Sequence, residues 1–177
     1  IRERFQYLRG FENAMTDIQD EFEKETAGPH DVAFKSAFQK KEVAKSFFKR
    51  YFPKKIVKQI DFRTFALNNR SYVDEKLREK HSDIVYRTRI KGEPAFLYIL
   101  LEHQSSPDFW IVFRLLCYMV NLWREFLDQN PDAKKLPVIL PAVLYNGKKT
   151  WSAPGAFADI VSGGEDMGRH VPNFSYD

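Results

Sequence analysis

The chain has 177 residues, of which 44% are hydrophobic and 29% charged, with a formal net charge of +4. This balance is that of an ordinary globular domain and excludes a disordered chain or a coiled-coil rod. The single cysteine excludes an intramolecular disulfide and a zinc site built mainly on cysteine. No apolar run reaches the roughly 18 residues that span a bilayer, and no signal peptide is evident. We therefore expect a cytoplasmic protein that does not bind membranes.

The first 28 residues predict an amphipathic helix. Apolar side chains recur at steps of three or four residues from Ile1 to Phe22. We expect this extension to precede one domain over residues 29–177, and we expect that domain to be cut short at its C-terminus. The apolar stripe must pack against the domain or against a partner chain, which leaves a homodimer or a structural role open.

A second helix is predicted to begin at Asp31 and to stop at Pro53. Its later part is strongly basic, because residues 40–58 hold eight basic residues and one acidic residue, a net of +7. Such a segment can neutralise DNA phosphates. The candidate DNA-binding residues are Lys41, Lys45, Lys49 and Arg50. The alternative is a solvated helix face with an aromatic core side. That core side comprises Phe47, Phe48, Tyr51 and Phe52.

The middle of the chain predicts strands. Residues 54–80 indicate short helical or irregular pieces with one strand near residues 60–67. Residues 82–90 predict a strand, and Lys91-Gly92-Glu93-Pro94 predicts a turn. A second strand follows over residues 95–104, and its continuous apolar run indicates burial on both faces.

The last third predicts a helix followed by a strand. The helix is expected from Pro107 to Gln129, and the apolar strand over residues 136–145, interrupted by its prolines. A short helix is expected over residues 154–160. The whole pattern is α/β, with a small sheet flanked by helices.

Two acidic residues lie in the predicted hairpin. A turn centred between Gly92 and Glu93 pairs residues whose numbers sum to 185, which places Asp83 opposite Glu102, with Cβ atoms about 4.5–5.5 Å apart. Two carboxylates so close repel unless a cation lies between them, and oxygen ligands suit Mg²⁺ or Mn²⁺. Gln104 follows on the same face and can position a water or a phosphate oxygen. The alternative is that both acids only mark solvent-exposed strand ends.

Five local motifs stand out in chain order. They are His30-Asp31-Val32-Ala33-Phe34-Lys35-Ser36-Ala37-Phe38, Ser82-Asp83-Ile84-Val85-Tyr86, Leu101-Glu102-His103-Gln104-Ser105-Ser106, Phe113-Arg114-Leu115-Leu116-Cys117-Tyr118-Met119, and the segment from Leu136-Pro137 to Asn146-Gly147 with Trp151. Together they resemble the recombination-promoting nuclease family, also known as YhgA-like transposases, within the PD-(D/E)XK nuclease superfamily. The resemblance covers residues 30–177.

This resemblance implies a restriction-endonuclease-like fold, in which helices flank a mixed central sheet. It implies metal-dependent hydrolysis of DNA phosphodiester bonds that promotes recombination or DNA mobility. Asp83 and Glu102 match the catalytic metal ligands, and Gln104 takes the place of the superfamily's lysine. We expect Mg²⁺ or Mn²⁺ to be bound by Asp83, Glu102 and the backbone carbonyl of His103, and we expect no organic cofactor.

Three further residues are candidates for supporting roles. Lys35 or Arg114 could supply the positive charge that Gln104 lacks, and Asp31 could reach the metal. Each has a plainer alternative: a surface lysine, part of a polar helix stripe that faces water, and a helix N-cap. The rival function is a catalytically weak nuclease-fold module that binds or assembles on DNA, which the glutamine at position 104 keeps open.

Overall fold

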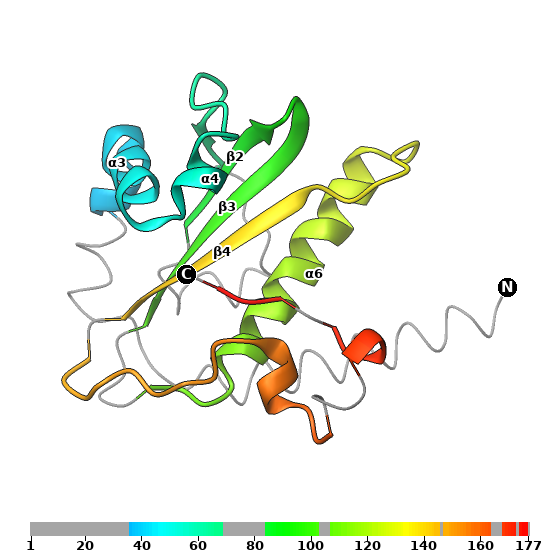
Figure 1. Cartoon of the computed structure of the whole chain (residues 1–177). Coiled ribbons are helices and arrows are strands. Elements are labelled where there is room, and N and C mark those ends of the chain that lie inside the picture. The colour runs from blue at the N-terminus through cyan, green and yellow to red at the C-terminus, as the bar shows by residue number, and fades with distance from the viewer. Residues whose placement is uncertain are drawn as a thin grey trace, which may run out of the picture.

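The computed structural model describes residues 36–68, 84–102, 107–145, 147–163, 168–172 and 174–176, with only the backbone of Leu101, Glu102 and Arg169. Four strands form one mixed sheet in the order β1-β2-β3-β4, with helices on both faces (Figure 1). The strands are β1 (Ala66–Leu67), β2 (Ile84–Ile90), β3 (Glu93–Glu102) and β4 (Val138–Tyr145). The helices are α3 (Lys41–Tyr51), α4 (Lys54–Val57) and α6 (Ile111–Gln129), with short 3₁₀ turns η1 (Phe157–Ile160) and η2 (Gly168–His170). The α/β class with a mixed, helix-flanked sheet is thus confirmed. The expected N-terminal helix lies outside the described residues.

The β2–β3 hairpin differs from its predicted register. Ile84 lies opposite Ile99 and Ile90 opposite Glu93, so paired residue numbers sum to 183 rather than 185. The turn consists of Lys91 and Gly92, whose φ angles of 53° and 85° are both in the left-handed region. A two-residue turn with positive φ at both positions matches the twist of the strands and fixes their register. The predicted register was therefore wrong by two residues, and the observed ladder does not support the predicted pairing of Asp83 with Glu102, which requires a sum of 185. A shift of two leaves every described residue of the hairpin on its predicted face.

Strand β4 runs parallel to β3, from Ala95 opposite Val138 to Glu102 opposite Tyr145. The predicted interruption at Pro141 does not occur. In the described sheet β4 has a neighbour on one side only, and an edge strand accepts a proline whose missing N–H would face away from the ladder. The prediction that β3 is covered on both faces is confirmed, because residues 95–100 are all buried.

Helix α3 covers one face of the sheet. Ala44, Phe48 and Phe52 recur at steps of four and are buried against Phe65 and Tyr86. Phe48 and Phe52 thus lie on the predicted core side, whereas Tyr51 is 63% exposed and does not. The Tyr86 ring stacks on Phe65 at 4.2 Å between centroids.

Helix α6 covers the opposite face (Figure 1). Ile111, Leu115, Tyr118 and Leu122 recur at steps of four and three and pack over Phe96, Tyr98 and Leu100 of β3. The helix begins at Ile111 and not at Pro107. The preceding residues form a turn in which the Asp108 carboxylate accepts a hydrogen bond from the Trp110 backbone N–H at 2.8 Å.

Candidate functional site

The predicted metal ligands belong to one end of the sheet. Glu102 is the last residue of β3 and pairs with Tyr145, the last residue of β4. Because β2 is antiparallel to β3, its first residue, Ile84, lies toward this same end. Asp83 directly precedes Ile84 in the chain but lies outside the described residues. Outside them too are Asp31, Lys35, His103 and Gln104.

This end of the sheet has a distinct side beneath α6. Tyr98 and Leu100 point toward α6, and the Tyr98 ring stacks with Tyr118 at 5.8 Å between centroids. Position 102 has the same parity as these two residues. Its β4 partner, Tyr145, contacts the Trp151 ring at 4.9 Å between centroids. The carboxyl ends of β3 and β4 therefore meet beside the α6 packing layer.

An ion pair fixes the turn that leads into α6. Arg114 and Asp108 side chains are only 6% and 11% exposed, and Arg114 Nη1 lies 3.3 Å from Asp108 Oδ2. This is a close ion pair rather than an aligned hydrogen bond, and a charged group so buried requires such a partner. The alternative prediction that Arg114 belongs to a helix stripe facing water is therefore wrong. The charge of Arg114 is compensated by a carboxylate.

Aromatic residues from the C-terminal segment line the same region. The Tyr176 hydroxyl donates to the Pro154 carbonyl at 2.9 Å, and its ring contacts Trp151. Burial raises the pKa of Tyr176, and the charges of Asp108 and Asp159 raise it further.

Tyr145 has a buried side-chain hydroxyl group. Its hydroxyl has no hydrogen-bond partner among the described residues. The phenol is folded against Gly147, where any side chain would collide with it. A buried hydroxyl without a partner is uncommon in a folded protein.

The basic candidates lie on α3, on the other side of the sheet. Lys45 Nζ is 3.8 Å from the Glu42 carboxylate, and Lys49 lies over the Phe62 ring at 5.3 Å. Arg50 lies over Tyr51 at 5.8 Å. Lys41, Lys49 and Arg50 are exposed. The structure therefore leaves these cations at the surface, where both the DNA-binding and the solvated-face interpretation would place them.

Sequence reasoning missed several polar residues that the fold brings into play. Asp108 was not singled out, although an acid shortly before an apolar helical stripe is a start signal for a helix. Arg87 and Arg89 were also missed; their alternation along a strand could have indicated an exposed face. Among the described residues, no three His, Cys, Asp or Glu side chains are grouped as a metal site would require.

The family comparison decides the relationship. The family described as "Putative transposase, YhgA-like" matches residues 28–177. The chain belongs to this family. The match includes every described helix and strand. No solved structure matches the chain significantly.

Three curated relatives show how this YhgA-like chain compares with named proteins. It is 32% identical over 130 residues to recombination-promoting nuclease RpnD of Escherichia coli O157:H7, covering 72% of this chain and 50% of the relative. It is 31% identical to RpnC of Escherichia coli K12, covering 69% and 40%. It is 28% identical to the inactive recombination-promoting nuclease-like protein RpnE of Escherichia coli K12, covering 71% and 42%. The chain thus spans about half or less of the length of these relatives. No described helix is long and apolar enough to cross a membrane.

Proposed function

We propose that this chain is the catalytic part of a Mg²⁺-dependent DNA endonuclease that hydrolyses phosphodiester bonds and promotes recombination or DNA mobility. Two relatives at 31–32% identity are named recombination-promoting nucleases, which supports nuclease chemistry. The observation that carries the site assignment is the antiparallel pairing of β2 with β3: β2, which directly follows Asp83, begins opposite Ile99, three residues before β3 ends at Glu102.

The donor set suits the proposed cation. Asp83 and Glu102 would supply carboxylate oxygens and His103 a backbone carbonyl oxygen, and such hard ligands are those that Mg²⁺ or Mn²⁺ prefers. Tyr145, at the strand position paired with Glu102, has a buried hydroxyl with no partner among the described residues, which supports a polar ligand at this edge. When bound, the cation would lower the pKa of a water and neutralise charge on the phosphoryl group.

The other residues would position the substrate. Gln104 has an amide that can donate to a phosphate oxygen or orient a water, although it cannot supply positive charge. Arg114 is already paired with Asp108, so we assign it a positioning role, holding the turn between Glu102 and α6. Lys35 then remains the proposed source of positive charge near the phosphate, and Asp31 a proposed additional metal contact.

DNA is the proposed partner. Exposed Lys41, Lys49 and Arg50 on α3, together with Lys45, would neutralise backbone phosphates and release counterions. These contacts carry no sequence information and would mainly set affinity.

A second function is favoured by one observation. A relative at 28% identity is named an inactive nuclease-like protein, and Gln104 stands where the superfamily has a lysine. The alternative is therefore a nuclease-fold module that binds DNA without cleaving it.

Incubation of supercoiled plasmid with the protein tests the proposal. We expect nicking with Mg²⁺ or Mn²⁺ and none with EDTA. Asp83→Asn should abolish nicking while leaving the circular dichroism spectrum unchanged. Asp132→Asn, which neutralises an exposed acid in the turn after α6, serves as the matched control and should nick normally. Nicking by folded Asp83→Asn at the wild-type rate would contradict the assignment. DNA binding by folded wild-type protein without nicking would favour the alternative.

A further inference from the structure

We propose that Arg87 and Arg89 bind backbone phosphates of a DNA strand in a cavity beside α6. The proposal rests on the proposed function for the identity of the ligand, and it adds a second contact region to that site. It concerns the hairpin end of the sheet, away from Glu102.

The cavity has a volume of about 260 Å³ and lies between the β2–β3 hairpin and the C-terminal half of α6. Arg87 and Arg89 line one side, and Phe126 and Gln129 of α6 line the other. None of the described residues that line it is acidic. Its chemistry is therefore cationic with an apolar wall, which suits an anion attached to a flat or apolar group, as a nucleotide unit is.

Strand alternation sends both arginines to this side. Tyr86 and Thr88 are buried on the α3 side of β2, whereas Arg87 and Arg89 are exposed on the other. Residues two apart on one strand face lie about 6.6 Å apart along the strand. Two guanidinium groups thus line the cavity in one row, and guanidinium is the side chain that binds phosphate oxygens in pairs.

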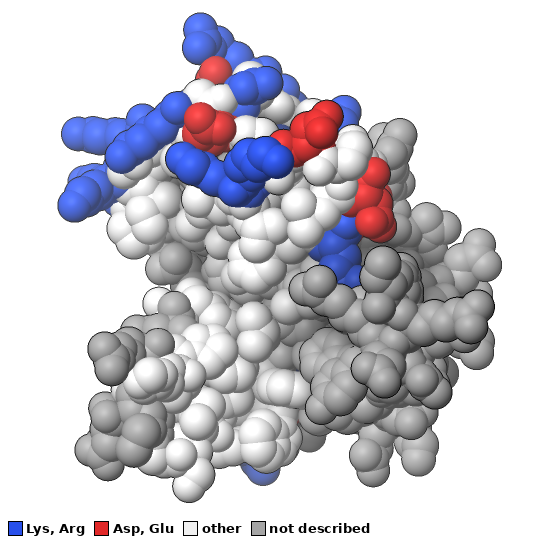
Figure 2. All heavy atoms as spheres, turned by 90° about the vertical axis from the view of Figure 1, so that its right-hand side faces the viewer, with Lys and Arg blue, Asp and Glu red and all other residues white. Residues whose placement is uncertain are grey.

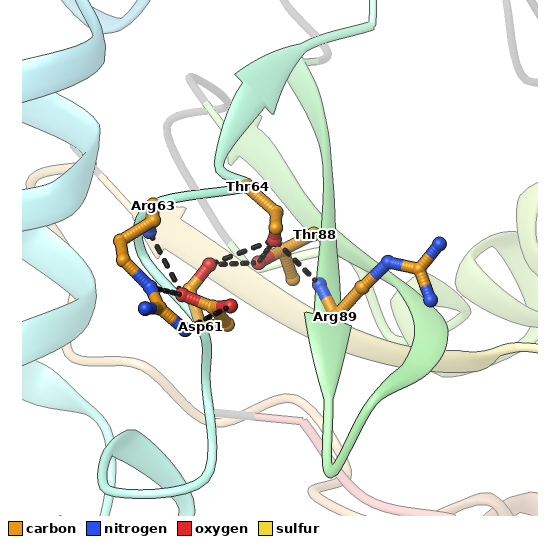
Figure 3. Close-up of polar contacts among 5 residues, drawn as sticks. All are labelled: Asp61, Arg63, Thr64, Thr88 and Arg89. Carbon is orange, nitrogen blue, oxygen red and sulfur yellow. Dashed lines mark hydrogen bonds and ion pairs between the residues drawn. The ribbon is translucent and has the colours of Figure 1, made fainter.

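A hydrogen-bonded network holds Arg89 in place (Figure 3). Its backbone N–H donates to Thr64 Oγ1 at 3.1 Å, and the hydroxyls of Thr64 and Thr88 donate to the Asp61 carbonyl at 2.8 and 3.0 Å. The Arg89 side chain points away from this network (Figure 3). The scaffold behind the cation is therefore ordered before any ligand binds, which lowers the entropic cost of binding.

Both guanidinium groups keep donors available. Arg89 Nη1 donates to the Gly92 carbonyl at 2.6 Å, which leaves its remaining N–H groups. The Arg87 backbone belongs to the sheet ladder, and its side chain has no hydrogen bond or ion pair with any residue that the structure describes. Among the described residues, neither cation forms an ion pair with a carboxylate, in contrast to Arg63 and Arg114.

The surrounding charge favours a polyanion. Lys and Arg side chains outnumber Asp and Glu over the upper part of the face in Figure 2, although acidic groups lie among them, and this is the end at which Figure 1 shows the hairpin turn. Arg87 and Arg89 lie three and five residues after Ile84, or about 10 and 17 Å along β2. A DNA strand bound at the proposed metal edge and following β2 would reach Arg87 first and Arg89 next.

Salt-dependent binding of a short labelled DNA duplex tests this inference. Fluorescence anisotropy in EDTA measures affinity without cleavage. The double variant Arg87→Gln/Arg89→Gln should bind more weakly, with a log–log salt slope smaller by about 1.8, because each lost phosphate contact removes about 0.9. Arg87→Lys/Arg89→Lys keeps both charges and should retain most of the slope.

The control variant is Lys134→Gln/Lys135→Gln. It makes the same change in net charge in the exposed loop after α6, outside the cavity lining, and should keep the wild-type slope. An unchanged slope in folded Arg87→Gln/Arg89→Gln, or an equal loss in the control, would overturn the inference. The nuclease proposal is judged separately by plasmid nicking, so wild-type nicking with an unchanged slope would refute the arginine site alone.

Discussion

The two faces of the sheet are packed by different chemistry. The face under α3 is filled mainly by aromatic and aliphatic groups, among them Phe48, Phe65 and Tyr86, and its buried polar residue Thr88 is hydrogen-bonded to the Asp61 carbonyl. The face under α6 has an equally apolar centre, but the turn that begins the helix is held by the buried Asp108–Arg114 pair. The partnerless Tyr145 hydroxyl and the Arg87–Arg89 cavity lie on this second side.

This difference separates stability from function. A hydrocarbon core stabilises a fold at little risk, whereas each buried polar group costs free energy unless it is matched. Unmatched or charged groups are therefore expected where a ligand binds. We infer that the α3 face mainly stabilises the domain and that the α6 face positions the reactive edge.

The largest stability effect is expected at the centre of the α3 face. Phe48 is fully buried and contacts the Phe52 and Phe65 rings at 4.9 and 6.1 Å between centroids. Phe48→Ala should lower the free energy of unfolding by about 3–5 kcal/mol, measured by urea denaturation. Tyr51→Ala, on the same helix but 63% exposed, should cost far less. If the folded fraction of Phe48→Ala nicked plasmid more slowly than wild type, the claim that the α3 face serves mainly stability would be wrong.

A slightly smaller stability effect, with an effect on activity as well, is expected at the charged pair of the α6 face. Arg114→Met leaves Asp108 buried without its cation and should cost about 3 kcal/mol. Asp108→Asn/Arg114→Met should recover part of this loss in a double-mutant cycle. Nicking should fall in Arg114→Met because the turn from Asp108 to Trp110 loses the ion pair that holds it. Additive stability losses would show that the two residues do not interact.

The hydroxyl of Tyr86 is expected to contribute a moderate amount on the α3 face. It donates to the Phe38 carbonyl at 2.7 Å. Tyr86→Phe should cost about 1 kcal/mol of unfolding free energy, since the ring remains and one hydrogen bond is lost. Tyr51→Phe is the exposed control. Equal values for the two variants would mean that this hydrogen bond adds nothing to stability.

The same residue predicts an alkaline pH dependence. Burial raises the pKa of Tyr86 to about 12, whereas the unfolded phenol titrates near its ordinary value of about 10. The folded state therefore holds its proton to higher pH, and the stability this provides is lost as pH rises from about 10 to 12. The melting temperature of Tyr86→Phe, measured as a function of pH, should therefore fall less between about pH 10 and 12 than that of the wild type. If the melting temperatures of wild type and variant fell in parallel with pH, the Tyr86 phenol would not have the raised pKa.

The smallest expected effect concerns the loop beside the hairpin. The Asp61 carboxylate accepts two hydrogen bonds from the Arg63 side chain and one from its backbone N–H, and these hold the pKa of Asp61 below its usual range. In Arg63→Gln the Asp61 pKa, measured by NMR titration, should rise toward that range. Stability should hardly change, since both groups are exposed to solvent screening. An unchanged Asp61 pKa would mean that the side-chain pairing does not persist in solution.

The helices and strands were largely predictable, because burial imposes regular spacing on apolar residues. The stripe of α3, the two-sided burial of β3 and the end of α6 at Gln129 all follow from the sequence. The hairpin register could not be predicted, because Lys91 has a left-handed backbone conformation, which few non-glycine residues adopt. The start of α6 was misplaced because Asp108 bonds the Trp110 N–H and delays the helix.

The candidate site was predictable in part. The motif around Glu102 was identified from the sequence, and the structure places its backbone at the end of β3. The roles of Asp83 and Gln104 stay predictions. The Asp108–Arg114 pair and the arginine cavity were not predictable, because both depend on how α6 packs against the sheet. Spacing along one chain does not reveal contacts between separate elements.

The single-turnover rate of plasmid nicking as a function of Mg²⁺ concentration tests the central claim most directly. Wild-type protein should reach a plateau, and folded Glu102→Gln should be at least about 100-fold slower at every concentration, about 2.7 kcal/mol in activation free energy. Asp132→Asn should follow the wild-type curve. A Glu102→Gln variant that nicks at the wild-type rate would show that the end of β3 does not hold the catalytic metal.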